Sequence, residues 1–85
     1  MTHELELFMK PTCPYCIKVM NFMSENNITI PLRDIVADES AAETLVAVGG
    51  KRQVPCLFID GKPLYESGDI IEWLRDNALE RAQRT

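Results

Sequence analysis

The 85 residues of this chain are enough for one small domain spanning residues 1–85 and too few for a second hydrophobic core. Its content of 46% hydrophobic and 26% charged residues is that of a globular protein, which excludes a disordered chain. A net charge of −4 gives no general attraction to nucleic acid or to an anionic membrane surface, so we expect neither as a partner.

Targeting signals are not visible in the sequence. Residues 1–6 have no basic start and no long apolar stretch, so we expect no signal peptide. No run approaches the roughly 18–20 apolar residues of a membrane span. The three cysteines include only one close pair, whereas a secreted disulfide scaffold would have more and matched cysteines. Catalytic cysteines in a reducing compartment fit this count better, so we expect a cytoplasmic protein. We also expect a monomer.

The first predicted elements are a strand followed by a helix. Over residues 4–9 apolar and acidic side chains alternate before the pattern becomes fully apolar, which is typical of a strand that enters a core. Thr12 or Cys13 can cap a helix over residues 14–26, whose first residue is a proline, a favourable choice for a first turn. The apolar side chains of this segment occupy most of the helix surface, so we expect it to be largely buried.

The middle of the chain predicts a second strand and a second helix. Residues 28–32 alternate again, but Pro31 cannot donate a hydrogen bond to a neighbouring strand, which indicates an edge strand. Residues 40–43 match a capping box, so we expect a helix from Ser40 to Val48 that ends at the two following glycines. The two strands and the helix between them predict a parallel β-α-β unit with a right-handed crossover.

The last third of the sequence predicts a hairpin and a final helix. Residues 54–59 are an apolar run typical of a central strand, Asp-Gly at 60–61 is a hairpin turn, and residues 62–66 return as an edge strand. Ser67 can cap the last helix. With the proline-bearing strands at the edges, we expect an α/β fold: a four-stranded mixed sheet in the order 2-1-3-4, flanked by three helices. We leave open whether residues 79–85 continue the last helix or fray.

The chemistry of the chain is concentrated in Cys13-Pro14-Tyr15-Cys16. The thiolate is the form of cysteine that attacks disulfides, and the N-terminal end of a helix stabilises negative charge on a sulfur. Cys13 occupies that end, with Lys10 three residues before it as a further positive charge. Cys16, one turn later and towards the apolar side, should remain a protonated thiol. A Cys-x-x-Cys next to a β-α-β pattern therefore predicts redox chemistry, with Cys13 attacking and Cys16 resolving.

Metal binding is the competing interpretation of the two cysteines. Structural zinc requires four ligands, usually two spaced pairs, and beyond this pair the sequence offers only Cys56 and His3. We therefore expect no metal site, and we expect Cys56, on its apolar run, to serve packing. A buried and inert cysteine pair is a third interpretation.

With these motifs in place, the chain resembles the glutaredoxins of the thioredoxin-fold superfamily over residues 4–77. Cys-Pro-Tyr-Cys is the signature of the dithiol members, and two further segments of the sequence support the resemblance: Val54-Pro55 with the apolar run that follows it, and Ser67-Gly68-Asp69. Two positions depart from the family pattern. Gln53 replaces the usual threonine, and Glu66-Ser67 replaces a glycine-rich turn and is similar to the turn of glutathione transferase N-terminal domains.

The resemblance implies the thioredoxin-like fold and a glutathione site. It implies a cis Pro55 that faces Cys13, and a γ-glutamyl site at the start of the last helix. The residues that it implies for glutathione binding are Lys10, Tyr15, Gln53, Val54, Pro55, Ser67, Gly68 and Asp69. No permanently bound cofactor is implied, only glutathione as a co-substrate.

The function that we expect from this resemblance is glutathione-dependent reduction of protein disulfides and of glutathione mixed disulfides. Its partners would be glutathione and disulfide-containing or glutathionylated proteins. Two alternatives remain at this point: a thioredoxin-like reductant supplied with electrons by a flavoprotein reductase, and a module that binds glutathione or an iron–sulfur cluster without catalysis.

Overall fold

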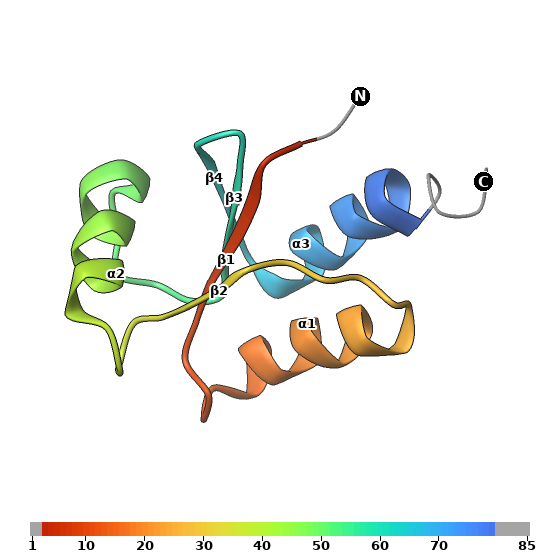
Figure 1. Ribbon diagram of the computed structural model, residues 1–85, viewed down its shortest axis with the longest axis horizontal. Helices are drawn as coiled ribbons and strands as arrows, with labels where there is room; N and C mark the ends of the chain where they lie inside the picture. Colours follow the sequence, from red (N-terminus) through yellow and green to blue (C-terminus); the bar gives the residue numbers. More distant parts are fainter. Residues whose placement is uncertain (1–2, 80–85) are drawn as a thin grey trace.

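The computed structural model of the chain describes residues 3–79, which form a four-stranded sheet and three α-helices (Figure 1). The strands are β1 (Leu5–Met9), β2 (Leu32–Asp34), β3 (Cys56–Ile59) and β4 (Lys62–Tyr65). The helices are α1 (Pro14–Glu25), α2 (Glu39–Thr44) and α3 (Ser67–Leu74), and the last two continue into single π-helical turns, η1 (Leu45–Gly49) and η2 (Arg75–Leu79). The sheet order is β2-β1-β3-β4, as the sequence predicts.

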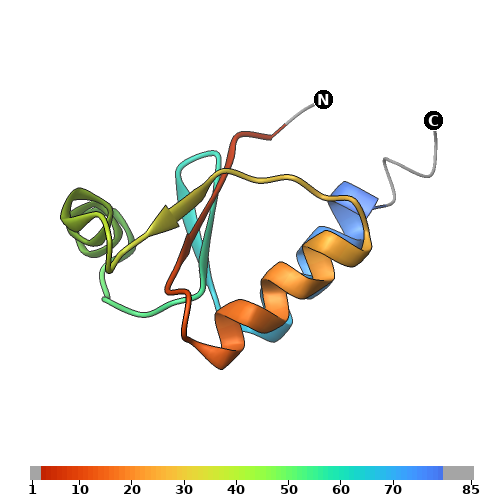
Figure 2. The same cartoon turned by 60° about the horizontal axis from the view of Figure 1, so that its bottom comes forward.

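The strand pairing agrees with the predicted β-α-β unit and hairpin. β1 pairs with β2 in parallel and with β3 antiparallel, and β3 pairs with β4 antiparallel. In both Figure 1 and Figure 2, α1 and α3 lie side by side on one face of the sheet, while α2 covers the opposite face. The protein therefore has three layers, with the sheet in the middle.

Each face of the sheet has its own hydrophobic core, which explains why β1 becomes fully apolar. Leu7 and Met9 belong to the cluster under α1 and α3, whereas Phe8 belongs to the cluster under α2. Leu7 and Phe8 are completely buried. A strand in the centre of a sheet that is covered on both faces needs apolar side chains on both sides. Full burial of one such side chain contributes about 1.5–3 kcal/mol.

The second strand lies further along the chain than the sequence pattern indicates. We expected a strand over residues 28–32, but β2 comprises Leu32–Asp34 and pairs in register with Leu7 to Met9. Pro31 precedes it and contributes only its carbonyl, which accepts a hydrogen bond of 3.0 Å from the Leu7 amide. The proline has no N–H to give to the sheet, so regular pairing begins after it. The predicted position of this second strand at the edge of the sheet is confirmed, because β2 is the outermost strand next to β1.

The second helix begins earlier than its predicted capping box. Its N-cap is Asp38 and not Ser40, because the Asp38 carboxylate accepts hydrogen bonds from the Ser40 backbone N–H at 3.0 Å and from the Ser40 hydroxyl at 2.7 Å. Aspartate is at least as good an N-cap as serine. The regular helix then stops at Thr44, and its last turn is the π-helical turn that ends at Gly49.

The predicted side-chain caps of the other two helices, α1 and α3, were also wrong. Cys13 occupies the N-cap position of α1, but no side chain caps this helix end. The N-cap of α3 is Glu66 rather than Ser67, with a φ of 76°, and its side chain makes no capping bond. Both helix ends consequently have backbone N–H groups without a side-chain cap.

His3, at the N-terminal end of the described residues, makes contacts that the sequence did not predict. The Nδ1 atom of His3, which we expected to be solvated, lies 2.6 Å from the Asp60 carboxylate, and its ring contacts Trp73 edge-on at 5.2 Å. The predicted alternatives for the C-terminal tail fall mainly on residues 80–85, which lie outside the described residues. Within residues 3–79, no helix has the length and apolar character needed to cross a membrane.

Candidate active site

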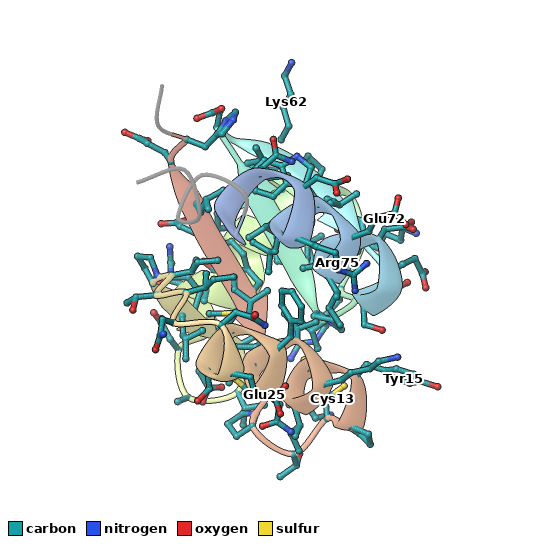
Figure 3. All side chains as sticks on the ribbon, turned by 90° about the vertical axis from the view of Figure 1, so that its right-hand side faces the viewer. Cys13, Tyr15, Glu25, Lys62, Glu72 and Arg75 are labelled. Atoms are coloured by element: carbon teal, nitrogen blue, oxygen red, sulfur yellow. The ribbon has the colours of Figure 1, made fainter. Side chains whose placement is uncertain are left out.

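Cys13 lies where β1 gives way to α1. The turn over residues 10–12 is closed by a hydrogen bond of 3.1 Å from the Cys13 amide to the Lys10 carbonyl. Cys13 is in an extended conformation with φ −81° and ψ 122°, and its carbonyl accepts the first helical bond, 2.9 Å from the Ile17 amide. Its side chain is half-buried at the N-terminal end of α1, where Tyr15 points away from the protein body (Figure 3).

The surroundings of Cys13 favour the thiolate. Partial burial by itself raises the pKa of this thiol, but the backbone N–H groups of Cys16 and Tyr15, the Cys16 side chain and the positive charge of Lys10 together outweigh burial. The net result is a pKa below the ordinary 9.0 of a cysteine. These N–H groups are those that a helix N-terminus leaves without intrahelical partners.

Cys16 has the opposite environment. It is completely buried in the cluster under α1 and α3, and its sulfur accepts a hydrogen bond of 3.4 Å from the Lys10 amide. The pKa of this thiol is raised from 9.0 to about 11: burial is the largest cause, the neighbouring Cys13 adds to the rise, and the Lys10 amide and ammonium partly offset it. The two cysteines thus differ as the sequence predicts: one is an accessible sulfur that ionises readily, and the other is a buried thiol that stays protonated.

A groove lies beside the cysteines, between α1, the segment before β3 and the start of α3. Its volume is about 420 Å³, and it is lined by Tyr15, Gln53, Val54, Pro55, Glu66 and Ser67. The Val54–Pro55 peptide bond is cis, as the resemblance implies. Val54 and Cys13 both pack against the core cluster under α1 and α3. Tyr15 is 64% exposed and forms an apolar wall of the groove.

One wall of the groove is formed by a pair of side chains that the sequence did not bring together. The Gln53 amide donates a hydrogen bond of 3.1 Å to the Glu66 carboxylate. Glu66 has a φ of 76°, in the left-handed region that non-glycine residues seldom adopt. Such backbone strain often occurs at ligand sites. Both residues were visible in the sequence as departures from the family pattern, and that was the only signal of their pairing.

The predicted glutathione residues divide into two groups in space. Tyr15, Gln53, Val54, Pro55 and Ser67 line the groove together. Lys10 lies outside its lining, close enough to the cysteines to influence both of their pKa values. Gly68 and Asp69 follow Ser67 in the first turn of α3 and are exposed, but they are not among the residues that line the groove.

Outside this groove, the surface of residues 3–79 shows no second group of cysteines and no group of metal-binding side chains. A larger hollow of about 490 Å³ lies against the start of β1 and the β3–β4 turn, and its lining contains two glutamates but no cysteine or histidine. Among residues 3–79, no three or more histidine, cysteine or acidic side chains are grouped closely enough to hold a metal ion. Cys56 is completely buried, in the cluster on the α2 side of the sheet, where burial raises its pKa to about 11.

A sheet of this order, a cis-proline groove and a Cys-x-x-Cys at the N-terminus of α1 define a protein of the thioredoxin fold with a dithiol site. The family model "Glutaredoxin" matches residues 5–64, most of the chain. The chain therefore belongs to the glutaredoxin family, a family of thiol oxidoreductases.

Individual proteins are similar to this chain in family or in fold. Glutaredoxin 1 of Rickettsia typhi is 27% identical over 86 aligned residues, which cover 98% of this chain and 82% of that protein. A crystal structure of a thioredoxin-like protein superposes with a TM-score of 0.73 at 28% identity, over 85% of this chain and 96% of the other. A glutathione S-transferase of Methylobacillus flagellatus, crystallised with glutathione bound, has a TM-score of 0.72 at 27% identity, over 86% of this chain and 36% of the transferase chain.

Proposed function

We propose that the protein is a glutathione-dependent thiol–disulfide oxidoreductase that reduces glutathione mixed disulfides and protein disulfides. The observation that carries this proposal is the contrast between the two thiols. Cys13 is accessible and has a lowered pKa, whereas Cys16, one helical turn away, is buried with a pKa of about 11. An attacking sulfur needs the first environment, and a sulfur held back until a later step needs the second.

Reduction of a glutathionylated protein requires only Cys13. Its thiolate attacks the glutathione sulfur of the mixed disulfide, the old sulfur–sulfur bond breaks, and the released protein thiolate takes up a proton. Cys13 is then joined to glutathione. The thiolate of a second glutathione attacks the glutathione sulfur of this adduct, which regenerates the Cys13 thiolate and yields oxidised glutathione.

Reduction of a protein disulfide also uses Cys16. The Cys13 thiolate attacks one sulfur of the substrate disulfide, the sulfur–sulfur bond breaks, and the other substrate sulfur leaves as a thiolate and takes up a proton from water. Cys16 then loses its proton and attacks the Cys13 sulfur of this mixed disulfide. The second substrate sulfur leaves and takes up a proton, which matches the one that Cys16 gave up. The product is a Cys13–Cys16 disulfide, and two glutathione molecules reduce it and become oxidised glutathione.

The groove beside Cys13 is the proposed glutathione site. Its volume of about 420 Å³ is in the range of small-molecule pockets, roughly 300–1,000 Å³. The Val54 backbone would pair with the cysteinyl part of the ligand, and Tyr15, Gln53 and Pro55 would line it.

The two charged ends of glutathione have separate partners in this proposal. Ser67, Gly68 and Asp69, at the uncapped N-terminus of α3, would hold the γ-glutamyl end, because free backbone N–H groups favour a carboxylate. Lys10 would meet the glycyl carboxylate. The bound glutathione of the similar transferase supports this choice of ligand.

Two variants test the proposal through opposite outcomes. Cys13→Ser should lose all activity, while Cys16→Ser should retain deglutathionylation and lose the two-cysteine reduction of protein disulfides. Activity would be measured with glutathione, glutathione reductase and NADPH, on a glutathionylated peptide and on a protein disulfide. Equal loss of both activities in the two variants would contradict the assigned roles.

A thioredoxin-like reductant is the second candidate, because a thioredoxin-like protein is among the similar structures. It would receive electrons from a flavoprotein reductase instead of glutathione. Turnover with thioredoxin reductase that exceeds turnover with glutathione and glutathione reductase would favour this candidate. In either case we propose a cytoplasmic monomer that acts on disulfide-containing or glutathionylated proteins and binds no cofactor permanently.

A further inference from the structure

The segment over residues 51–54, which carries one wall of the groove, has little backbone support. The hydrogen-bonded pairing of β3 with β4 ends at the pair Cys56 and Tyr65. It cannot continue in the usual way, since Pro55 has no N–H and Glu66 turns away with a φ of 76°. Among the backbone–backbone hydrogen bonds that the described residues form outside helices and strands, none involves residues 51–55.

Side chains from the end of β4 continue the connection where the backbone pairing stops. The Tyr65 hydroxyl donates a hydrogen bond of 3.0 Å to the Lys51 carbonyl, and the Lys51 ammonium lies 4.7 Å from the centre of the Tyr65 ring. Glu66, the residue after β4 and the N-cap of α3, accepts the hydrogen bond of 3.1 Å from Gln53. Tyr65 and Glu66 thus each hold one residue of the groove segment: Tyr65 holds Lys51 and Glu66 holds Gln53.

The turn before this segment is also shaped around Tyr65. The π-helical turn η1 packs against β4 and ends at Gly49. A Cβ atom at Gly49 would overlap the Tyr65 hydroxyl and would approach the Tyr65 Cζ atom to 3.3 Å. The glycine therefore leaves the space that the tyrosine hydroxyl needs to reach Lys51.

We propose that Tyr65 is a positioning residue of the glutathione site: through Lys51 it holds the Gln53–Val54 backbone in place before the ligand arrives. This inference rests on the proposed function for the identity of the ligand. Tyr65 does not line the groove, so its effect on the ligand is indirect.

The physical benefit of such a contact is a lower cost of binding. A ligand that must order a loose segment loses affinity in proportion to the freedom that the segment gives up. The segment follows Gly50, whose φ of 92° is readily adopted only by glycine, so the turn before it is itself permissive. A contact that orders residues 51–54 in advance should therefore lower KM for the glutathione-bearing substrate and leave the chemistry at Cys13 unchanged.

Tyr65→Phe tests this because it removes one hydroxyl and keeps the ring, its packing and its contact with the Lys51 ammonium. We expect KM for a glutathionylated peptide to rise about three- to tenfold, which corresponds to about 0.7–1.4 kcal/mol, with kcat changed less than about twofold. The NMR order parameters of the Gln53 and Val54 amides should fall from about 0.85 towards 0.6. The pH profile of Cys13 alkylation should not move.

Thr44→Val is the matched control. It also removes one side-chain hydroxyl that donates a 3.0 Å hydrogen bond to a backbone carbonyl, that of Ser40, in the helix leading to the same segment. It should lower stability to a comparable degree and change neither KM nor the order parameters of residues 53 and 54. An equal rise of KM in both variants would show general destabilisation and would overturn the inference.

Gly49→Ala provides a second, independent variant. Its added methyl group should displace the Tyr65 hydroxyl and raise KM as Tyr65→Phe does. In the double variant no hydroxyl remains to be displaced and only the 3.3 Å approach to the ring is left, so the rise in KM should be clearly smaller than the product of the two single effects. Effects that multiply fully in the double variant would contradict a shared mechanism.

The outcomes separate this inference from the proposed function. Unchanged order parameters in Tyr65→Phe overturn the inference whatever the kinetics are, and lowered order parameters with an unchanged KM overturn the link to binding. If the unaltered protein shows no glutathione-dependent turnover, the proposed function fails, while the order parameters still decide whether Tyr65 holds the segment.

Discussion

Replacing Cys13 with serine leaves Cys16 as the only thiol of the dithiol site and makes its reactivity measurable. Burial, the largest influence on the pKa of Cys16, remains in this variant, while the smaller contributions from Cys13 are removed. In the unaltered protein the pKa of Cys16 is raised from 9.0 to about 11. Cys16 should therefore react slowly at neutral pH even when its neighbour is absent.

The size of the effect follows from two opposing terms. At pH 7 a thiol of pKa 9 is about 1% thiolate and a thiol of pKa 11 about 0.01%, a hundredfold difference. The more basic thiolate is the better nucleophile, and a Brønsted slope of about 0.4–0.5 over two pKa units returns about six- to tenfold. Protonation alone should thus make alkylation about ten- to sixteenfold slower than for a free thiol, and closer to tenfold once the Cys13 contributions are gone. The complete burial of the Cys16 sulfur should slow it further.

The assay is labelling with iodoacetamide at pH 7, with the modified cysteine mapped by mass spectrometry so that Cys56 is counted separately. The rate should continue to rise with pH beyond pH 9. In urea, where burial is lost, Cys16 should react like a free thiol, and in Cys16→Ser the remaining Cys13 should react faster than a free thiol does. Folded-state labelling of Cys16 at the free-thiol rate would refute the argument that burial keeps it protonated.

Three further results are expected. Lys10→Gln should raise the pKa of Cys13 slightly in an alkylation–pH profile, because Lys10 is the smallest of the lowering influences, and a fall would contradict its role. His3 and the Glu4 amide hold the pKa of Asp60 below its ordinary value in the folded state. The ionised carboxylate therefore stabilises the fold above about pH 4, and this stabilisation is lost as the pH falls through the lowered pKa. Asp60→Asn should therefore narrow the difference in urea midpoint between pH 6 and pH 3, and an unchanged difference would argue against the pair. Leu45→Ala should cost about 2–5 kcal/mol in urea unfolding and Val46→Ala less than about 0.5, since only the former is fully buried.

The sequence was sufficient for the topology because its strongest signals are those of periodicity and of proline. Proline in the second and fourth predicted strands indicated the two edges of the sheet, which left the first and third strands for the centre, and the observed order agrees. The different ionisation of Cys13 and Cys16 was predicted from the helix end and Lys10 for the first thiol and from the apolar side of the helix for the second. The directions of the two pKa shifts agree with this prediction.

The boundaries of elements were less predictable, because several residues compete for the same role. Asp38 and Ser40 are both good caps, and only the tertiary path of the chain decides between them. The alternating pattern over residues 28–32 correctly indicated a buried side chain at Ile30. Regular pairing with β1 nevertheless begins only after Pro31, at Leu32.

The contacts around the groove depend on register, which local patterns do not specify. Tyr65 and Lys51 are 14 residues apart and meet only because β4 ends beside the segment before β3. The positive φ of Glu66 is equally a consequence of the turn from β4 into α3. Local residue patterns contain no signal for either feature.

The two-faced sheet also determines which disulfides the three cysteines can form. Cys13 and Cys16 belong to the cluster under α1 and α3, whereas Cys56 points to the α2 side, since successive side chains of β3 alternate between faces. The sheet backbone stands between Cys56 and the other two sulfurs. In the proposed redox cycle, oxidation within the folded chain would therefore be restricted to the Cys13–Cys16 disulfide, and repeated cycles would proceed without disulfide scrambling as long as the sheet remains intact.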